Sequence, residues 1–251
     1  MTKIRVSVVG AKGRMGKSVC EAVENSENLE LALTLDLGDS LDLISKENTD
    51  VVVEFTIPDT SFDNVQTLVK NKVDVVVGTT GWNSDKIASI ESLLQEGQSV
   101  LIAPNFSISA VLLERFAKEA APYFESVEVV EMHHPDKLDA PSGTARSTAS
   151  SIAKARLEAG FSNDFLSGPD KTTKDELGTR GGKVDGIPVH AIRLRGLNAH
   201  ELVLFGNPGE QMEIRQDSFT RESFMPGILK AIDYVSNSNN SGLIFGLDKI
   251  L

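Results

Sequence analysis

Cysteine, tryptophan and long apolar runs are nearly absent from this sequence of 251 residues. The single cysteine, Cys20, has no second cysteine to pair with, which excludes an internal disulfide and is typical of a reducing compartment. No apolar run approaches the roughly 18 residues that a membrane helix requires. Residues 1–6 are charged and then β-branched, and they lack the apolar core of a secretory signal. We therefore expect a cytoplasmic protein that is neither exported nor inserted in a membrane.

Basic residues are also in short supply, since 25 Lys and Arg stand against 36 Asp and Glu, a formal net charge of −11. Nucleic acids and anionic membranes attract proteins with a basic field, so we expect neither as a partner. A small anionic ligand would have to be bound by a local cluster of cations and backbone amides. The hydrophobic content of 40% is ordinary for a globular protein, and the length suits one large domain or two modest ones.

The first hundred residues alternate between short apolar runs and segments with helical spacing. The runs that we interpret as strands are 4–9, 29–36, 51–56, 73–77 and 100–103, with Pro58 closing the third. The segments with helical spacing are 15–24, 61–70 and 84–94. Strands that alternate with helices in this way predict an α/β fold, a Rossmann-type, doubly wound parallel sheet.

The pattern changes after Asn105. Helical spacing over 108–121 and 144–158 flanks a strand at 127–132, and three strand-like runs then follow without helices, at 189–194, 201–205 and 211–217. This order predicts a second, α+β domain with a mixed or antiparallel sheet. A last helix at 224–235 precedes a flexible link and an apolar tail. The stretch 161–186 has no sustained period, and a loop of this length is either a functional lid or a surface loop.

A glycine-rich turn lies between the first predicted strand and the first predicted helix. It comprises Gly10, Ala11, Lys12, Gly13, Arg14, Met15 and Gly16. Glycines at such a turn allow backbone N–H groups to approach a pyrophosphate at the helix N-terminus. The spacing G-x-x-G-x-x-G is one residue away from the dinucleotide fingerprint, so a plain glycine turn fits the turn alone equally well.

The surroundings of the turn favour a nicotinamide cofactor. Asp36 ends the second predicted strand about 20 residues beyond the glycines, where an acid meets the ribose hydroxyls. Two more segments end predicted strands at the same edge, where open α/β sheets bind ligands. They are Gly78, Thr79 and Thr80 after the fourth strand, and Ala103, Pro104, Asn105 and Phe106 after the fifth. We therefore predict that all of these residues bind the cofactor.

The choice between NADH and NADPH stays open in the sequence. An acidic residue at position 36 disfavours a 2′-phosphate and points to NADH. Lys12 and Arg14 in the turn are placed to neutralise that phosphate, which favours NADPH.

A second cluster joins a predicted strand to a predicted helix. His133 and His134 are adjacent, Lys137 follows, and Pro141 to Thr144 begin the helix with free amides and a hydroxyl. These groups suit a substrate that carries carboxylates. An NAD(P)H enzyme that reduces a C=C or C=N bond also needs a proton donor, and histidine is the usual one near neutral pH.

Two other interpretations of this cluster compete with an active site. A metal site would use the histidines with Glu131 and Asp136, but adjacent strand residues point in opposite directions and no further His or Cys lies close in sequence. We therefore predict no metal. A solvated loop before a capped helix is the plainer alternative and is the default interpretation of this segment taken alone. It loses weight because an NAD(P)H-dependent reductase needs a proton donor.

The run from Glu131 to Thr144 resembles the signature of the 4-hydroxy-tetrahydrodipicolinate reductase family, also called dihydrodipicolinate reductase. The similarity covers nearly the whole chain. It includes the glycine turn, residues 54–56, 78–81 and 103–107, and the later segments 185–190 and 199–201. Pro135 after the two histidines is similar to the shorter, actinobacterial-type members.

The resemblance implies a reaction and roles for residues. The reaction is hydride transfer from NADH or NADPH to a cyclic, conjugated imine dicarboxylate, giving tetrahydrodipicolinate in the diaminopimelate route to lysine. His133 is the implied proton donor and Lys137 its catalytic partner. The residues implied to hold the substrate carboxylates are His134, Lys137, Gly143 and Thr144.

The resemblance also implies a domain organisation. Residues 1–106 with 218–251 form the cofactor domain, and residues 107–217 form the substrate and tetramerisation domain of a homotetramer. One position departs from many relatives, because Asp136 is acidic where they carry a basic residue. An acid there either weakens the positive potential around Lys137 or points to solvent. His190 and His200 lie on predicted strands, and we interpret them mainly as structural, with a contact to the substrate loop as the alternative.

Two other functions remain as alternatives. A different two-domain dehydrogenase would need a catalytic Lys or Cys elsewhere, and Cys20 is badly placed for that role. A nucleotide sensor that lost turnover would not need the His-His-x-x-Lys cluster.

Overall fold

The computed structural model describes residues 2–251, which form two compact units. Unit 1 comprises the residues up to Ile108 together with Arg221–Leu251, and unit 2 comprises Ser109–Thr220. No helix within the described residues is both long and apolar enough to cross a membrane.

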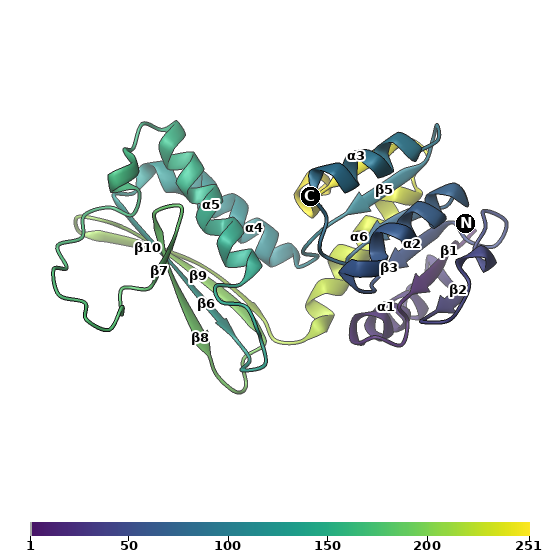
Figure 1. The fold of residues 1–251 in the computed structure, drawn as a ribbon, viewed down its shortest axis with the longest axis horizontal. Helices are drawn as coiled ribbons and strands as arrows, with labels where there is room; N and C mark the ends of the chain where they lie inside the picture. Colours follow the sequence, from purple (N-terminus) through teal and green to yellow (C-terminus); the bar gives the residue numbers. More distant parts are fainter. Residues whose placement is uncertain (1) are drawn as a thin grey trace. The chain divides into compact units, whose positions relative to one another are not determined.

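Unit 1 is built on a parallel sheet (Figure 1). Over residues 2–251, its strand order is β11-β5-β4-β3-β1-β2. The strands are β1 (Ile4–Val9), β2 (Leu29–Leu35), β3 (Val51–Glu54), β4 (Asp74–Val77), β5 (Ser99–Ile102) and β11 (Gly242–Phe245). Every residue of β3, β4 and β5 is buried, as expected for strands covered on both faces. The apolar runs in the sequence therefore form the middle of the sheet.

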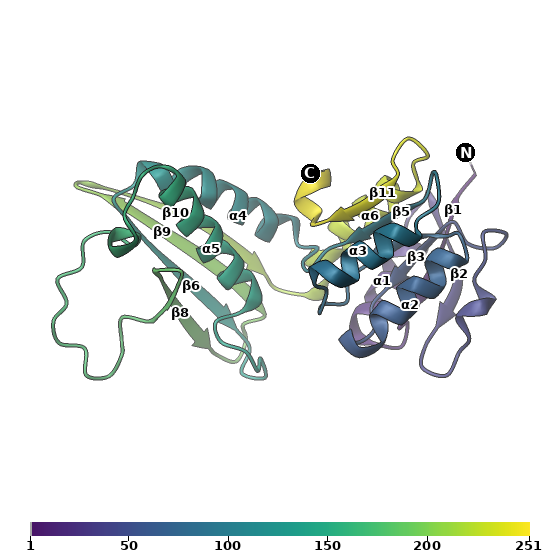
Figure 2. The ribbon, with the colours of Figure 1, turned by 45° about the horizontal axis from the view of Figure 1, so that its top comes forward.

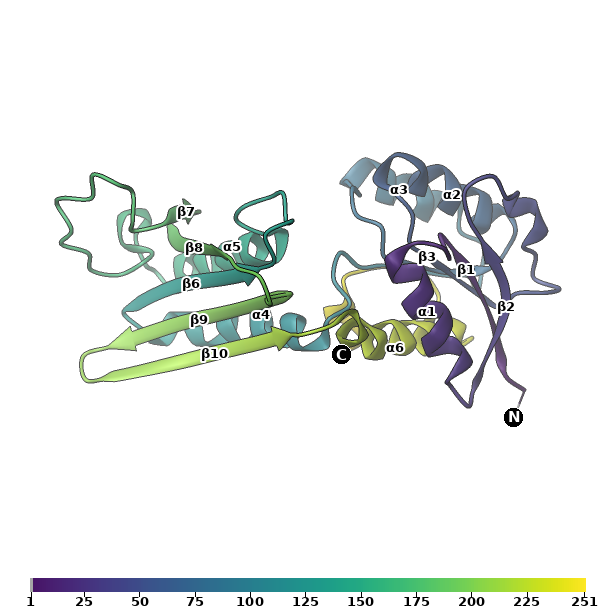
Figure 3. The same ribbon diagram turned by 90° about the horizontal axis from the view of Figure 1, so that it is seen from below.

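Helices cover both faces of this sheet. Figure 3 shows α2 (Pro58–Lys70) and α3 (Ser84–Leu93) on one side, and α1 (Arg14–Glu24) and α6 (Met225–Ser236) on the other. The prediction of a doubly wound, Rossmann-type sheet is confirmed.

Two elements of unit 1 differ from the sequence prediction. The apolar tail forms β11, which lies beside β5 in Figure 2. The two strands pair in parallel, with Leu243 opposite Val100. Pro58 does not close a strand but stands in the first turn of α2. Proline is well suited to that position, because its missing N–H has no helical partner there and its φ angle is already helical.

Unit 2 carries the second sheet, with strand order β10-β9-β6-β8-β7. Its strands are β6 (Ser126–His133), β7 (Gly182–Val184), β8 (Ile187–Arg193), β9 (Ala199–Asn207) and β10 (Glu210–Ser218). The pair β6–β8 is parallel and the other pairs are antiparallel, so the sheet is mixed as predicted. The helices α4 (Ile108–Ala120) and α5 (Gly143–Glu158) cover one face, and Figure 3 shows the strands with the other face turned to the viewer.

The stretch 161–186 is attached to the second sheet at several points. Leu166 is buried in the core of unit 2, and β7 pairs with β8, a short strand that the irregular sequence did not predict. Arg180 forms ion pairs with Glu128 on β6 and with Asp170 in the loop itself. A role of this stretch as a lid stays a prediction.

Candidate functional site

The residues predicted to bind the cofactor lie at the carboxyl ends of adjacent strands of unit 1. The turn 10–13 follows β1, Asp36 follows β2, residues 78–80 follow β4, and residues 103–106 follow β5. Parallel strands bring all of these ends to one edge of the sheet, which is the edge that binds ligands in open α/β folds.

The glycine turn is closely packed at two of its glycines. Gly10 has a φ of +83°, and a Cβ there would lie 2.1 Å from the carbonyl oxygen of Phe55. A Cβ on Gly16 would lie 2.1 Å from the carbonyl oxygen of Gly10. Both glycines are therefore required by the backbone that forms the turn. No side chain among the described residues caps the start of α1, so its first amides point at the space before the helix.

Asp36 lies against this turn. Its Oδ2 accepts a hydrogen bond of 2.7 Å from the backbone N–H of Lys12, and its Oδ1 accepts one of 2.8 Å from Leu37. The hydrogen bonds from the N–H groups of Leu37 and Lys12 lower the pKa of Asp36, so the carboxylate is ionised at neutral pH. An ionised carboxylate beside an uncapped helix start fits the ribose and pyrophosphate of a dinucleotide.

The ends of β3, β4 and β5 are in direct contact with one another. The hydroxyl of Thr79 accepts a hydrogen bond of 2.8 Å from the N–H of Thr56, and the rings of Phe55 and Phe106 lie 5.9 Å apart. A Cβ on Gly78 would lie 2.0 Å from the Phe55 ring, so only glycine leaves room for that ring. In the segment after β5, Asn105 Oδ1 accepts a hydrogen bond of 2.9 Å from the N–H of Ser107. The structure thus brings the predicted segments of these strand ends together.

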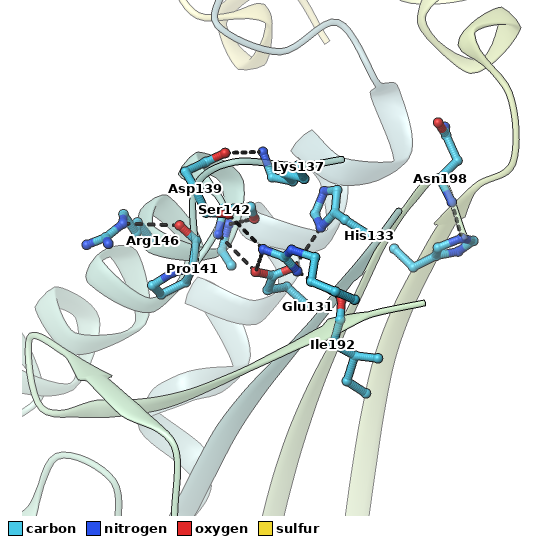
Figure 4. Close-up of polar contacts among 12 residues, drawn as sticks. Glu131, His133, Lys137, Asp139, Pro141, Ser142, Arg146, Ile192 and Asn198 are labelled. Carbon is cyan, nitrogen blue, oxygen red and sulfur yellow. Dashed lines mark hydrogen bonds and ion pairs between the residues drawn. The ribbon is translucent and has the colours of Figure 1, made fainter. Parts of the chain in front are cut away.

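The predicted substrate cluster lies in unit 2, where β6 ends at His133 and α5 begins at Gly143. Figure 4 shows that the loop between them brings Lys137 and Asp139 near His133 and Glu131. Ser142 caps α5, since its Oγ accepts a hydrogen bond of 3.2 Å from the N–H of Ala145. Local sequence explains this geometry, because a β-branched strand ends at the histidines and a Ser cap begins the helix.

The buried carboxylate of Glu131 holds the residues of the cluster together. Its side chain is fully buried and accepts a hydrogen bond of 2.6 Å from Nδ1 of His133. Arg193 donates to both carboxylate oxygens at 2.8 Å, and the N–H of Ser142 donates to Oε1 at 3.1 Å. With Nδ1 bound to a carboxylate, the donating proton of His133 is at Nε2.

The titration of this pair follows from its burial and its hydrogen bonds. Burial opposes the ionisation of Glu131, yet the hydrogen bonds from Arg193 and His133 outweigh it and lower the pKa of Glu131. Burial lowers the pKa of His133 below its ordinary value, and Glu131 offsets part of that shift. An imidazolium with a lowered pKa is a stronger acid, which suits a proton donor.

Lys137 is paired with Asp139 at 2.8 Å, and this ion pair lowers the pKa of Asp139. Asp136, the departure noted in the sequence, is exposed to solvent. The carboxylate bound to the lysine is therefore that of Asp139, two residues along, rather than that of its direct neighbour.

The remaining predicted substrate residues stand on either side of the loop. His134 is the first residue after β6, and Gly143 and Thr144 are the first two residues of α5. A Cβ on Gly143 would meet no atom within 4 Å, so the space beside its Cα is open. Their roles as carboxylate ligands stay predictions.

The other two histidines are paired with acids elsewhere in the sheet. Nε2 of His190 lies 2.7 Å from Glu128, and Nδ1 of His200 lies 2.7 Å from Asp217. Nε2 of His200 accepts a hydrogen bond from the N–H of Asn198, so its proton is on Nδ1. Among residues 2–251, no group of three His, Cys, Asp or Glu side chains is arranged to hold a metal ion.

Sequence reasoning did not assign roles to Glu131 and Arg193. Glu131 and His133 are two residues apart on a strand, so the alternation of side chains was a signal that they share a face. Arg193 gave no such signal, because its position opposite His133 arises from the parallel pairing of β6 and β8.

Comparisons with known proteins cover both units. The family model "Dihydrodipicolinate reductase, N-terminus" matches residues 4–106, and "Dihydrodipicolinate reductase, C-terminus" matches residues 109–251. A 4-hydroxy-tetrahydrodipicolinate reductase of Bifidobacterium longum is 58% identical over 99% of both chains. One of Corynebacterium urealyticum is 50% identical over 99% of this chain and 98% of the relative. A solved dipicolinate-bound dihydrodipicolinate reductase from Paenisporosarcina sp. TG-14 is 35% identical, with a TM-score of 0.87 over 100% of both chains.

Proposed function

Because the chain belongs to the dihydrodipicolinate reductase family, we propose that it reduces 4-hydroxy-tetrahydrodipicolinate, through dihydrodipicolinate, to tetrahydrodipicolinate. The family resemblance drawn from the motifs is confirmed. The reductant is NADH or NADPH, and the reaction belongs to the diaminopimelate route to lysine. The observation that carries the proposal is the match to named reductases over the full length of both chains.

The cofactor supplies a hydride to the conjugated imine when it is bound. The chain's own residues provide the rest of the chemistry. His133, held by Glu131, donates a proton from Nε2 to the reduced ring, and Lys137 stabilises the negative charge that develops there. His134, Lys137 and the amides at the start of α5 hold the substrate carboxylates, as a helix N-terminus favours anions.

The proposal assigns one function to each unit. Unit 1 binds the dinucleotide through the turn 10–13, Asp36 and the ends of β4 and β5, and unit 2 binds the substrate. We also propose that the domain boundaries predicted from the sequence separate these two functions. They assign residues 1–106 with 218–251 to the cofactor domain and residues 107–217 to the substrate domain. We further propose a cytoplasmic protein with neither nucleic acid nor membrane among its partners.

We propose that the chain forms a homotetramer through the sheet of unit 2. Within residues 109–220, which form unit 2, no helix covers the outer face of that sheet (Figure 3), and the side chains of this face include partly exposed apolar residues. These are Val130, Met132, Ile192, Leu202 and Leu204. An uncovered apolar sheet face favours burial against another copy. Light scattering of the purified chain measures the oligomeric state directly.

The function is tested by following NAD(P)H oxidation with the freshly made product of the preceding synthase reaction. We expect turnover by the unaltered chain, and a loss of about 10²-fold in kcat/KM for Lys137→Ala, because the variant lacks the cation for the substrate and the developing charge. Lys154→Ala is the matched control, since this exposed lysine lies on α5 away from the loop. Retained cofactor binding without any turnover would instead favour the sensor.

Cofactor preference is tested at Asp36. We expect Asp36→Ala to raise the KM for NADH about tenfold, because an ionised acceptor for the ribose hydroxyls is lost. The KM for NADPH should fall or stay unchanged, because the same change removes repulsion from the 2′-phosphate. The control is Asp42→Ala, which changes an acid in the same region. Equal changes for both cofactors would show that Asp36 does not discriminate between them.

A further inference from the structure

A second buried carboxyl lies beside Glu131, and the mechanism above does not use it. Glu201 on β9 is the direct cross-strand partner of Glu131 on β6. Residues directly opposite in an antiparallel pair point to the same face, with Cβ atoms about 5 Å apart. Glu201 is 2% exposed and Glu131 is 0% exposed, so both carboxyls lie on the inner side of the sheet.

The two acids differ in their partners. Glu131 is bound by Arg193, by His133 and by the N–H of Ser142. Oε1 of Glu201 is buried without a hydrogen-bond partner in residues 2–251, and the same holds for Oγ1 of Thr148. A buried carboxylate with an unpartnered oxygen is costly, whereas the neutral acid is tolerated.

The elements packed around Glu201 contribute acids and neutral groups. Glu114 approaches from α4, and its Oε1 is occupied by hydroxyls of α5. Gln216 is the neighbour on β10, and Thr148 faces Glu201 from α5. On β6 the neighbour is Glu131, whose negative charge is shared with Arg193. The charges that act most strongly on Glu201 are the carboxylates of Glu114 and Glu131, and both are negative.

These surroundings determine the titration of Glu201. Burial raises the pKa of Glu201 to about 7, and the charges of Glu114 and Glu131 also raise it. The hydroxyl of Thr148 acts in the opposite direction and lowers the pKa in part. The side chain therefore changes its charge near neutral pH, in the range where a cytoplasmic enzyme works.

We propose that Glu201 is a positioning residue for the reduction, a neutral acid that leaves Glu131 as the single anion behind His133. The proposal rests on the proposed function, because it concerns the same proton donor. When Glu201 loses its proton, a second negative charge stands beside Glu131 and stabilises the imidazolium of His133. His133 then holds its proton more tightly and is a weaker acid toward the substrate.

Titration of the histidine rings by NMR tests the proposal without any need for turnover. In the unaltered protein, the His133 titration is expected to be broad, because His133 and Glu201 interact. In Glu201→Gln, which keeps the neutral form at every pH, we expect one sharper step with its midpoint lower by about half a pH unit or more. An unchanged His133 titration overturns the proposal, whether or not the chain is a reductase.

A matched control uses the other histidine–glutamate pair of the sheet. Glu128→Gln removes the acid beside His190, on the opposite face of the sheet, and should leave the titration of His133 unchanged. If Glu201→Gln fails to fold, the NMR chemical shift of the Glu201 carboxyl carbon is followed against pH in the unaltered protein instead. A midpoint near pH 7 supports the proposal, and a midpoint near the ordinary value of glutamate overturns it.

Kinetics supply a readout that a merely structural role would not move. The unaltered chain should show an inflection near pH 7 in kcat/KM for the synthase product, and Glu201→Gln should lack it. At pH 6 the two proteins should agree within about twofold, because both carry a neutral side chain at position 201. Identical pH profiles for the two proteins would overturn the positioning role.

Discussion

Alanine in place of His133 is expected to lower kcat about 10³-fold while the dissociation constant for NADH stays unchanged. General acids contribute roughly 10²- to 10⁴-fold to enzymatic rates, and His133 has the geometry of one. Its Nδ1 is bound to the buried Glu131, so the ring is held in one orientation with Nε2 left to donate. The residues proposed to bind the cofactor belong to unit 1, so the affinity for NADH should not change. Steady-state NAD(P)H oxidation and a fluorescence titration with NADH measure the two quantities.

The comparison variant for this experiment is His190→Ala. His190 also pairs with a glutamate at hydrogen-bond distance, but it lies on the opposite face of the same sheet. Its kcat should stay within about threefold of the unaltered chain, because its ring lies on the face of the sheet away from Glu131 and His133. Unchanged turnover in His133→Ala would remove His133 as the proton donor. Circular dichroism of the variant, compared with that of the unaltered chain, separates a lost proton donor from a disrupted fold.

The architecture of unit 1 could be predicted from the sequence because its signals are local. Buried parallel strands appear as uninterrupted apolar runs, as in Val51–Glu54, and each run is followed by a turn and a helical period. Residues 242–245 lacked such a context. They are too few to be distinguished from a tail, and they become a strand only because β5 offers its edge.

The candidate site could be predicted in part for the same reason. His133, Lys137 and Ser142 lie within ten residues of one another, so their closeness in sequence predicts that they are close in space. Asp36 and the glycine turn are farther apart in sequence, but the alternation of strands and helices predicts that adjacent parallel strands end at the same edge. The hydrogen bond from the N–H of Lys12 to Asp36 agrees with this prediction.

The support of the site could not be predicted in this way. Arg193 lies 62 residues from Glu131 in sequence, and its contact depends on the register of β6 with β8. Glu201 looked like one polar residue at the start of a strand. Its burial beside Glu131 depends on the register of β6 with β9 and on the two helices above them. Such registers arise from long-range pairing, and periodicity in one segment does not reveal them.

Another buried charge, that of Arg156, anchors the C-terminal end of α5; its side chain is 0% exposed. Its guanidinium donates to the carbonyl oxygens of Ala121 and Phe124 at 2.9 and 2.6 Å, and to that of Glu125 at 2.7 Å. It also stacks over the ring of Phe161, 4.0 Å from the centroid. Burial lowers the pKa of Arg156, and the partial negative charges of carbonyls after α4 compensate the cation. This side chain therefore ties the end of α5 to the start of β6.

Arg156→Ala is expected to lower the free energy of unfolding of unit 2 by about 3 kcal/mol. Hydrogen bonds from a charged donor contribute about 1.5–3 kcal/mol each. The variant no longer has to bury a cation, and this gain offsets part of the loss. Urea unfolding followed by circular dichroism measures the loss. The single tryptophan, Trp82, lies in unit 1, so its fluorescence reports the other unit separately. Lys154→Ala, an exposed change on the same helix, should leave both transitions in place. A loss below about 1 kcal/mol for Arg156→Ala would mean that water replaces the guanidinium at these carbonyls.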